Sequence, residues 1–222
     1  NREPRFYSSL GFDRGIMRSW GGLWQLKMRY DEDHGRFGFT SDYLTSGYSL
    51  KKLIHPDSEG DAYNKIVPYP WPIIRLSELY LNYAQALNEA NGPSQQVYDA
   101  LNNIRDRAGI PTVEQAWSDV SVAANPGKHT NVVGLREIIK QERLIELAFE
   151  GHRYNDLRRW KIAEEYLSSS IRGWSVDESS EANFYNLRDI GIRSFSSPRD
   201  YLHPISFDEL SINPSLVQNP GW

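Results

Sequence analysis

The sequence of 222 residues contains no cysteine. Disulfide bonds, thiolate metal sites and a cysteine nucleophile are therefore excluded. No apolar run approaches the roughly 18–20 residues that a membrane-spanning helix needs. The Lys and Arg residues are scattered and the formal net charge is −4, which argues against a nucleic-acid partner. The histidine spacing does not indicate a zinc site, and no phosphate-binding glycine loop or GxSxG motif is present. We therefore expect no metal and no cofactor.

Aromatic residues, in contrast, make up 13% of the chain. Most rings of this kind fill a protein core, whereas exposed rings beside polar groups form platforms for flat ligands such as sugars. Residues 18–37 combine aromatic rings with polar side chains around the pair Gly21-Gly22. The candidate ligand-binding residues are Arg18, Trp20, Trp24, Tyr30 and Phe37. For the two tryptophans the alternative is inward packing, because their spacing of four residues is also that of a helix core.

Composition divides the chain into three segments. Residues 1–70 have no sustained helical period, and we expect short strands and long loops there. Three prolines in "VPYPWP" (67–72) end this loop-rich segment. A helical scaffold is predicted over 71–167, and an irregular tail with a short extended stretch over 168–222. The predicted fold class is mainly α, with long irregular loops and a few short strands.

Within the scaffold, apolar residues at helical spacing predict helices over 73–92 and 95–109, joined by a short Gly-Pro turn. Such a helical hairpin resembles one tetratricopeptide unit, which cannot bury its own apolar face alone. A short helix is expected near 113–119. A third long helix is predicted over 135–151 and a fourth over 152–167.

The stretch "ERLIELAFEGHRYNDLRRW" (142–160) contains eight formal charges and a histidine in nineteen residues. On a helix, Glu142, Glu146 and Glu150 would lie on one face at i, i+4 and i+8, where like charges repel. Such a column persists most easily if cations face it, and arginine binds carboxylates through two bonds. We therefore predict an ion-pair lattice that locks the helices together. The candidate cations are Arg75, Arg105, Arg107, Arg153 and Arg159.

The same carboxylates could also be the acid and base of a glycosidase, which lie about 5–9 Å apart. A glycosidase, however, needs one carboxyl with a raised pKa in an open cleft. Here every glutamate of the column has arginines nearby in sequence, which would lower its pKa. The structural interpretation is therefore preferred over the catalytic one.

Several motifs along nearly the whole chain carry a resemblance to a known family. They are "REPRFYSSL" (2–10), "SGYSLKKLI" (46–54), "IIRLSELYLNYAQALNEA" (73–90), "ALNNIRDRAGIP" (100–111), "IIKQERLIELAFEGHRYNDLRRW" (138–160), "LHPIS" (202–206) and "ELSINPSLVQNPGW" (209–222). Together they resemble the C-terminal half of SusD/RagB proteins. From residue 73 onward these form four ordered motifs, with 202–206 and 209–222 counted as one, and their suitable separations make the resemblance more specific than any single pattern in the chain.

The resemblance implies a mainly helical, tetratricopeptide-like lipoprotein of the Bacteroidetes outer membrane. Such proteins are not enzymes. They bind oligosaccharides at the cell surface and deliver them to a TonB-dependent transporter of the SusC type. The chain starts at Asn1 without a start methionine or signal peptide, so we expect a fragment or processed piece whose lipid anchor belongs to a missing N-terminal part. Two alternatives stay open: a helical-repeat module that binds only the transporter, and a glycoside hydrolase.

Overall fold

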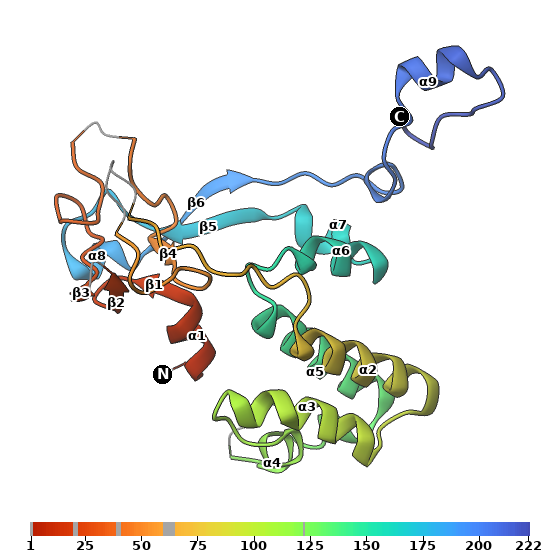
Figure 1. Cartoon of the computed structure of the whole chain (residues 1–222), viewed down its shortest axis with the longest axis horizontal. Coiled ribbons are helices and arrows are strands. Elements are labelled where there is room, and N and C mark those ends of the chain that lie inside the picture. Colours follow the sequence, from red (N-terminus) through yellow and green to blue (C-terminus); the bar gives the residue numbers. More distant parts are fainter. Residues whose placement is uncertain (1, 20–21, 39–40, 60–64, 122) are drawn as a thin grey trace. The chain divides into compact units, whose positions relative to one another are not determined.

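A computed structural model describes the chain apart from residues 1, 20–21, 39–40, 60–64 and 122 (Figure 1). The described chain is mostly helical with a few short two-stranded sheets, so the predicted mainly α fold is confirmed. It forms two compact units. The first comprises Asn1–Lys27 and Tyr48–Glu150, and the second Met28–Gly47 and Gly151–Trp222. These units interleave along the sequence.

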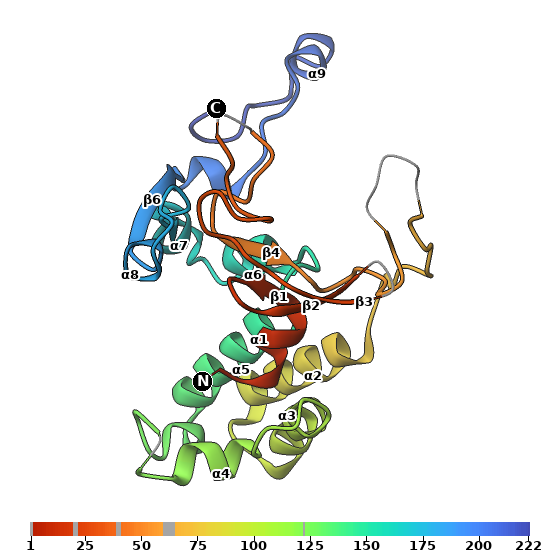
Figure 2. The same cartoon turned by 90° about the vertical axis from the view of Figure 1, so that its left-hand side faces the viewer.

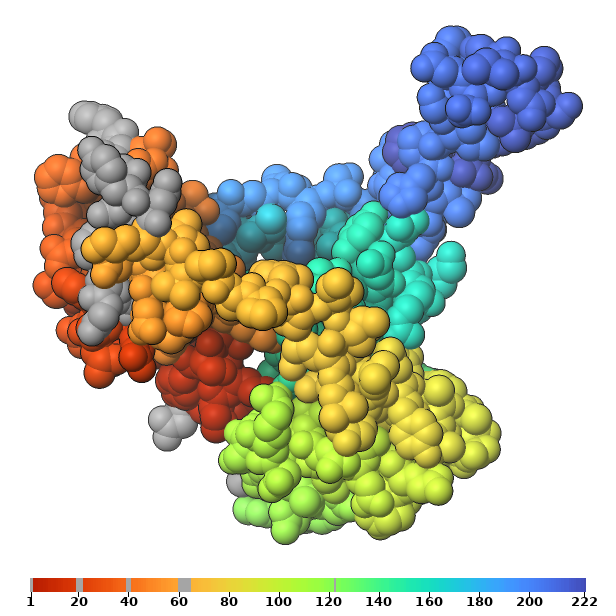
Figure 3. Space-filling view, viewed as in Figure 1, coloured from red at the N-terminus to blue at the C-terminus, as the bar shows by residue number. Residues whose placement is uncertain are grey.

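Helices α2 (Leu76–Asn91) and α3 (Gln95–Arg107) of the first unit form the predicted helical hairpin. Gly92 ends α2 with a φ of 81°, a left-handed conformation that glycine adopts without strain. Helix α5 (Val132–Glu146) packs along α2. In the space-filling view the yellow-to-green atoms of α2 and α3 form one continuous body (Figure 3).

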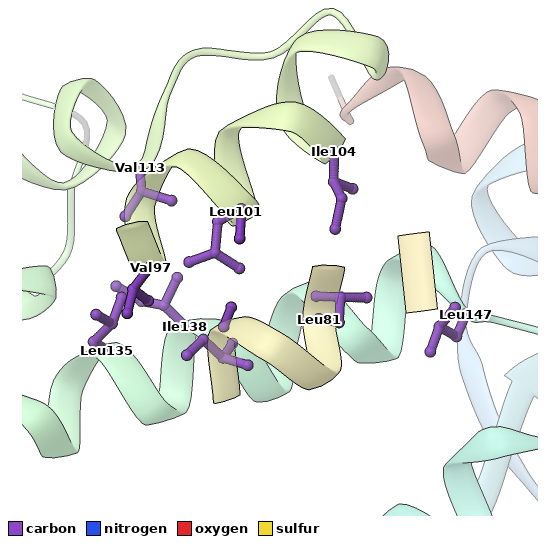
Figure 4. Close-up of a cluster of buried hydrophobic side chains, with 11 residues drawn as sticks. Leu81, Val97, Leu101, Ile104, Val113, Leu135, Ile138 and Leu147 are labelled. Carbon is purple, nitrogen blue, oxygen red and sulfur yellow. The ribbon is translucent and has the colours of Figure 1, made fainter. Parts of the chain in front are cut away.

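Apolar side chains from these helices point toward one another and form the core of the first unit (Figure 4). Leu81, Leu101 and Ile139 are fully buried, and each such side chain stabilises the fold by about 1.5–3 kcal/mol. The core residues are Leu81, Ala84, Val97, Ala100, Leu101, Ile104, Val113, Leu135, Ile138, Ile139 and Leu147. The helical spacing predicted the inward face of α3 correctly. It did not predict that of α2, because Leu76, Leu79 and Tyr83 of the expected apolar stripe are more than half exposed.

Local hydrogen bonds determine where the shorter helices begin. Helix α4 (Val113–Ser118), which was predicted, starts with a capping box between Thr112 and Gln115. The 3₁₀ turn η1 (Lys128–Thr130) precedes α5, whose N-cap Asn131 accepts a bond from the backbone N–H of Gly134.

The N-terminal part of the first unit contains the short strands expected there and one helix that was not. Strand β1 (Leu10–Phe12) pairs with β4 (Tyr48–Leu50), and β2 (Ile16–Ser19) pairs with β3 (Gly22–Gln25). The additional element is α1 (Pro4–Ser9), which has a proline in its first turn. Six residues are too short for a periodic pattern to reveal a helix.

In the second unit, the tail expected to be irregular contains a β-hairpin. Strand β5 (Ser170–Trp174) pairs antiparallel with β6 (Leu187–Ile192). The short helix α8 (Glu181–Phe184) lies between them in sequence. A Cβ on Gly173 would lie 2.7 Å from Cα of Ser46. Glycine is required at this position because the backbone at Ser46 packs directly on β5.

The prediction of one helix over 152–167 is wrong. Lys161 has a φ of 58° and separates α6 (His152–Arg159) from α7 (Ala163–Leu167). Leu157, Ala163 and Phe195 form a small core beside this break. Two further short elements, η2 (Arg199–Tyr201) and α9 (Phe207–Ile212), follow. In the described residues, no helix combines the length and apolarity needed to cross a bilayer.

Candidate functional site

The charged stretch of the sequence leads to a buried cluster in the first unit, at the end of α5. We call it the glutamate cluster: Glu142, Glu146 and Glu150 with Arg5, Lys52, Arg75, Arg105 and Arg107. Helix α1, which carries Arg5, lies against α5 (Figure 2). The cations come from four separate stretches of the sequence, so the cluster joins elements that are distant along the chain.

Glu142 lies at the most enclosed end of the cluster. Its carboxylate accepts a bond from Arg5 at 2.9 Å and another from Arg105. The side chains of all three residues are less than a tenth exposed. Burial lowers the pKa of Arg5, but bonds and charges of Glu3 and Glu142 outweigh it and raise the pKa overall. The guanidinium therefore stays charged.

Glu146 is the centre of the cluster. Its side chain is 3% exposed, and Arg75 and Arg107 lie 3.1 and 2.7 Å from its carboxylate. Arg5 approaches the same carboxylate at 3.5 Å. Lys52 donates to the backbone carbonyl of Glu146 at 2.7 Å. The carboxylate thus bridges α1, α3 and the residue before α2.

Glu150 belongs to the cluster but not to the helix. Helix α5 ends at Glu146, and Phe149 has a φ of 66°. Glu150, which was predicted at position i+8 of the helix, therefore lies in a turn. The Glu150 carboxylate lies 2.7 Å from Arg75 and 2.5 Å from Lys52. Burial raises the pKa of Glu150, but hydrogen bonds from Arg75 and Lys52 outweigh burial and hold the pKa below its ordinary value.

Three of the five cations in the cluster were predicted from the sequence, whereas Arg5 and Lys52 were not. Arg75, Arg105 and Arg107 face the glutamates as expected. The two cations placed after Gly151 have different contacts in the second unit. Arg159 pairs with Asp156 at 2.8 Å, three residues earlier on α6, and Arg153 lies 4.9 Å from the ring centre of Tyr166. Arg159 thus pairs within its own helix, and Arg153 contacts a ring on α7.

The geometry of the glutamate cluster does not suit acid–base catalysis. A glycosidase acid needs a raised pKa and access to substrate. Here the carboxylates are 3–12% exposed and each bonds at least two cations. Removing one partner from such a buried set strands the opposite charge, which is strongly destabilising. The arrangement can therefore hold elements together.

The predicted ligand-binding residues are distributed over both units. Trp20 lies outside the described residues. Arg18 and Trp24 belong to the first unit, on strands β2 and β3. Tyr30, half-buried, and Phe37, 63% exposed, belong to the second unit.

The β2–β3 hairpin presents Arg18 and Trp24 on opposite faces. Met17 pairs with Trp24, and Arg18 pairs with Leu23, and directly paired residues share a face of the ladder. The side chain of Trp24 is 48% exposed. Inward packing and exposure were the two alternatives for this ring, and in the structure about half of the side chain is exposed.

A cavity of about 440 Å³ lies beside this hairpin in the first unit. Its walls include Pro4, Tyr7, Ser8, Met17, Arg18 and Lys51. Tyr7 is 40% exposed, and its ring makes edge contacts with Phe6 and Phe12 at 5.4 and 5.7 Å between centroids. A ring that is supported on its edge and partly open suits stacking against the C–H face of a sugar.

Polar groups flank the Tyr7 ring. The Arg18 guanidinium is 3.4 Å from Asp57, and both side chains are more than half exposed. The Lys51 ammonium donates to the carbonyls of Tyr7 and Ile16, both at 2.9 Å. The hydroxyl of Ser8 donates to a backbone carbonyl and keeps acceptor capacity. These groups can donate to and accept from sugar hydroxyls.

A larger cavity, of about 610 Å³, lies in the second unit beside Tyr201. The Tyr201 ring there has other contacts: the Lys161 ammonium lies 4.4 Å from its centroid, and Phe195 packs against it at 4.8 Å. Its hydroxyl accepts from the Ala163 backbone. The ring is therefore less available for stacking than Tyr7, and the cavity beside Tyr7 is the better candidate site.

The sequence model of the SusD family matches residues 1–222. The chain belongs to the SusD family. Two relatives are SusD-like proteins P2 and P25 of Formosa agariphila, which are 31% and 30% identical to it over 150 and 148 residues. These matches cover 67% and 66% of this chain but 25% and 23% of the relatives. The chain thus spans about a quarter of the length of the curated relatives it matches.

Solved SusD-like structures are similar over the same residues. BT4246 has a TM-score of 0.80 and 30% identity, covering 100% of this chain and 36% of that chain. The SusD-like protein BF3747 of Bacteroides fragilis has a TM-score of 0.76 and 29% identity, covering 100% and 39%. BF0978 of the same species, described as a SusD-like carbohydrate binding protein, has a TM-score of 0.68 and 27% identity, covering 96% and 41%.

In this SusD family chain, sequence reasoning missed the candidate site residues Tyr7, Ser8 and Lys51. All three lie in motifs that carried the family resemblance, "REPRFYSSL" and "SGYSLKKLI". The β1–β4 pairing connects these motifs through Leu10 and Leu50. Such pairing between distant short strands leaves no periodic signal in the sequence.

Proposed function

We propose that the protein binds oligosaccharides at the cell surface without cleaving them. It would then deliver them to a TonB-dependent outer-membrane transporter of the SusC type. Membership of the SusD family over residues 1–222 carries this proposal. The description of BF0978 as a SusD-like carbohydrate binding protein supports it. The proposal concerns the protein at its full natural length, which a lipid anchor outside this chain would hold on the outer membrane.

The cavity beside Tyr7 is the site to which we assign oligosaccharide contact. Its ring supplies a stacking surface, and Arg18 and Ser8 supply hydrogen bonds at the margins. Trp24, on the face of the neighbouring hairpin that also carries Met17, extends the aromatic surface. The glutamate cluster has a structural role, because its carboxylates already bond cations inside the protein.

Titration calorimetry of the full-length protein against a panel of oligosaccharides tests the proposal. We expect at least one glycan to bind. Tyr7→Ala should weaken that binding by at least about fivefold, because loss of a central aromatic contact costs more than about 1 kcal/mol. Tyr154→Ala is the matched control. Its ring is 45% exposed, compared with 40% for Tyr7, and lies outside this cavity.

Other outcomes of this titration would change the assignment. Equal weakening by both variants would show that the Tyr7 cavity is not the site. If no glycan gives heat while the protein still associates with its transporter, oligosaccharide binding is refuted. The second candidate function, a helical-repeat module that binds only the transporter, would then replace it. The tetratricopeptide-like hairpin of α2 and α3 is the observation that favours this alternative.

A further inference from the structure

Two aromatic side chains of the first unit lie in the segment "PYPWP" (68–72), between prolines. We call Tyr69 and Trp71 the proline-flanked pair. Their ring centroids lie 6.3 Å apart, with an angle of 35° between the ring planes, a separation typical of interacting aromatic pairs. Trp71 is 61% exposed, whereas Tyr69 is half-buried. The segment therefore presents an exposed indole ring beside a second ring that supports it.

The prolines restrict the backbone at both rings. A proline fixes its own φ at about −65°, and it confines the residue before it to extended conformations. Tyr69 and Trp71 each precede a proline, so both are restricted in this way. Prolines also lack the N–H that a β-ladder requires, and residues 66–72 belong to no helix or strand. The pair is therefore held in place without a sheet, and ordering it for a ligand costs little conformational entropy.

A hydrogen bond connects the pair to the segment that forms one wall of the cavity beside Tyr7. The Tyr69 hydroxyl donates to the backbone carbonyl of Leu53 at 2.7 Å. The next residue in the chain, Ile54, lines that cavity and is 40% exposed. The proline-flanked pair thus lies beside the wall of the candidate site, on the same compact unit.

The chemistry of the exposed ring suits a sugar. An indole combines a flat apolar face with an N–H donor, so it can stack on the C–H face of a sugar ring and donate to a hydroxyl. Ile73, two residues further on, is 87% exposed but is a branched aliphatic side chain without either feature. Trp71 and Ile73 therefore provide a matched comparison between stacking and simple apolar exposure.

We propose that Trp71 forms an outer subsite, and that the ligand is a glycan chain long enough to run from the Tyr7 cavity, past the wall that contains Ile54, onto the indole. This inference rests on the proposed function and specifies its ligand class, an extended oligosaccharide. Tyr7 contacts one part of the chain, and Trp71 stacks on a sugar ring further along it. Tyr69 is a positioning residue, because its hydroxyl is already bonded to the backbone and its ring supports the indole.

Titration calorimetry of the full-length protein with size series of glycans tests the proposal. The probes are linear oligosaccharides of glucose, xylose, mannose and galactose, each from disaccharide to octasaccharide. For the series that binds, Trp71→Ala should weaken the longest member by at least about fivefold and leave the shortest unchanged, because only a long chain reaches the indole. Trp71→Tyr should recover part of this loss, because a ring remains. Tyr7→Ala should weaken every member, and the control Ile73→Ala should weaken none.

Equal weakening of all chain lengths by Trp71→Ala, or no weakening at any length, would overturn the outer subsite. A melting temperature clearly lower for Trp71→Ala than for Ile73→Ala would also overturn it, because the indole would then be packed inside the full-length protein. In each of these cases, weaker binding by Tyr7→Ala would show that the proposed function still holds. Absence of heat from every glycan with the natural protein would instead refute the proposed function, and the subsite with it.

Discussion

At Glu146, a nearly fully buried carboxylate bonds guanidinium groups from different parts of the chain. Arg5 comes from α1, Arg75 precedes α2, and Arg107 ends α3. Charges of this kind are costly to bury singly but acceptable when each has its partners. The pairing of each charge therefore explains why so many carboxylates and guanidiniums can meet in one buried cluster without forming a catalytic site.

Replacing Glu146 with alanine should destabilise the protein by about 3 kcal/mol, because the substitution leaves the buried Arg5 with fewer acceptors. Urea unfolding of the variant and the natural protein measures the difference. Glu89→Ala is the control. The side chains of Glu89 and Arg136, which form an ion pair, are 38% and 33% exposed. Loss of this pair should therefore cost less than about 1 kcal/mol. Equal effects of the two substitutions would show that the glutamate cluster is not a buried structural element.

Glu150 predicts a pH dependence of stability. Its pKa is lowered in the folded protein, whereas in the unfolded chain it should be about 4.3. The folded state therefore gains stability above the unfolded pKa and loses it as pH falls through the folded pKa. We expect Glu150→Gln to be less stable than the natural protein at pH 7, with the difference shrinking as the pH is lowered below about 4. A difference that stays constant from pH 7 to pH 3 would contradict this account.

At the scale of elements, the long helices were predictable and the short ones were not. Helices α2, α3 and α5 repeat apolar residues over several turns, which made their existence predictable. Helix α3 buries the face that the spacing predicts, whereas α2 leaves much of its expected apolar stripe exposed. Helix α1 and the β5–β6 hairpin are short and depend on distant partners. Arg5 of α1, for example, bonds Glu142, 137 residues away. No local pattern contains that information.

The same limit applies to the candidate site. The sequence indicated an aromatic and polar region around residues 18–37, but strand pairing determines which side chains meet. Arg18 lines the cavity beside Tyr7, whereas Tyr30 and Phe37 belong to the other unit. The break at Lys161 was also hidden, because a positive φ at a lysine leaves no sequence signature.

The start of α5 provides a test at the element scale. A Cβ on Gly134 would lie 1.9 Å from the carbonyl oxygen of Lys128, a backbone atom that cannot rotate away. We expect Gly134→Ala to lower the free energy of unfolding by at least about 2 kcal/mol. Val133→Ala, on the same turn and 63% exposed, should have a much smaller effect. Similar melting temperatures for the two variants would refute the close approach.

At the scale of the whole molecule, structural and binding roles are assigned to different surfaces. The first unit combines a helical core, the glutamate cluster and the cavity beside Tyr7. Matches to the SusD-like relatives cover only a quarter of their length. In this account, the protein retains an oligosaccharide for transport and leaves its glycosidic bonds intact.

The most direct test is a reducing-end assay on the full-length protein with a glycan that it binds in the calorimeter. The account predicts that prolonged incubation releases no more reducing ends than buffer alone, because the carboxylates of the glutamate cluster already bond arginine and lysine. Steady release by pure protein, abolished by Glu146→Gln at an unchanged melting temperature, would contradict it and indicate a glycoside hydrolase.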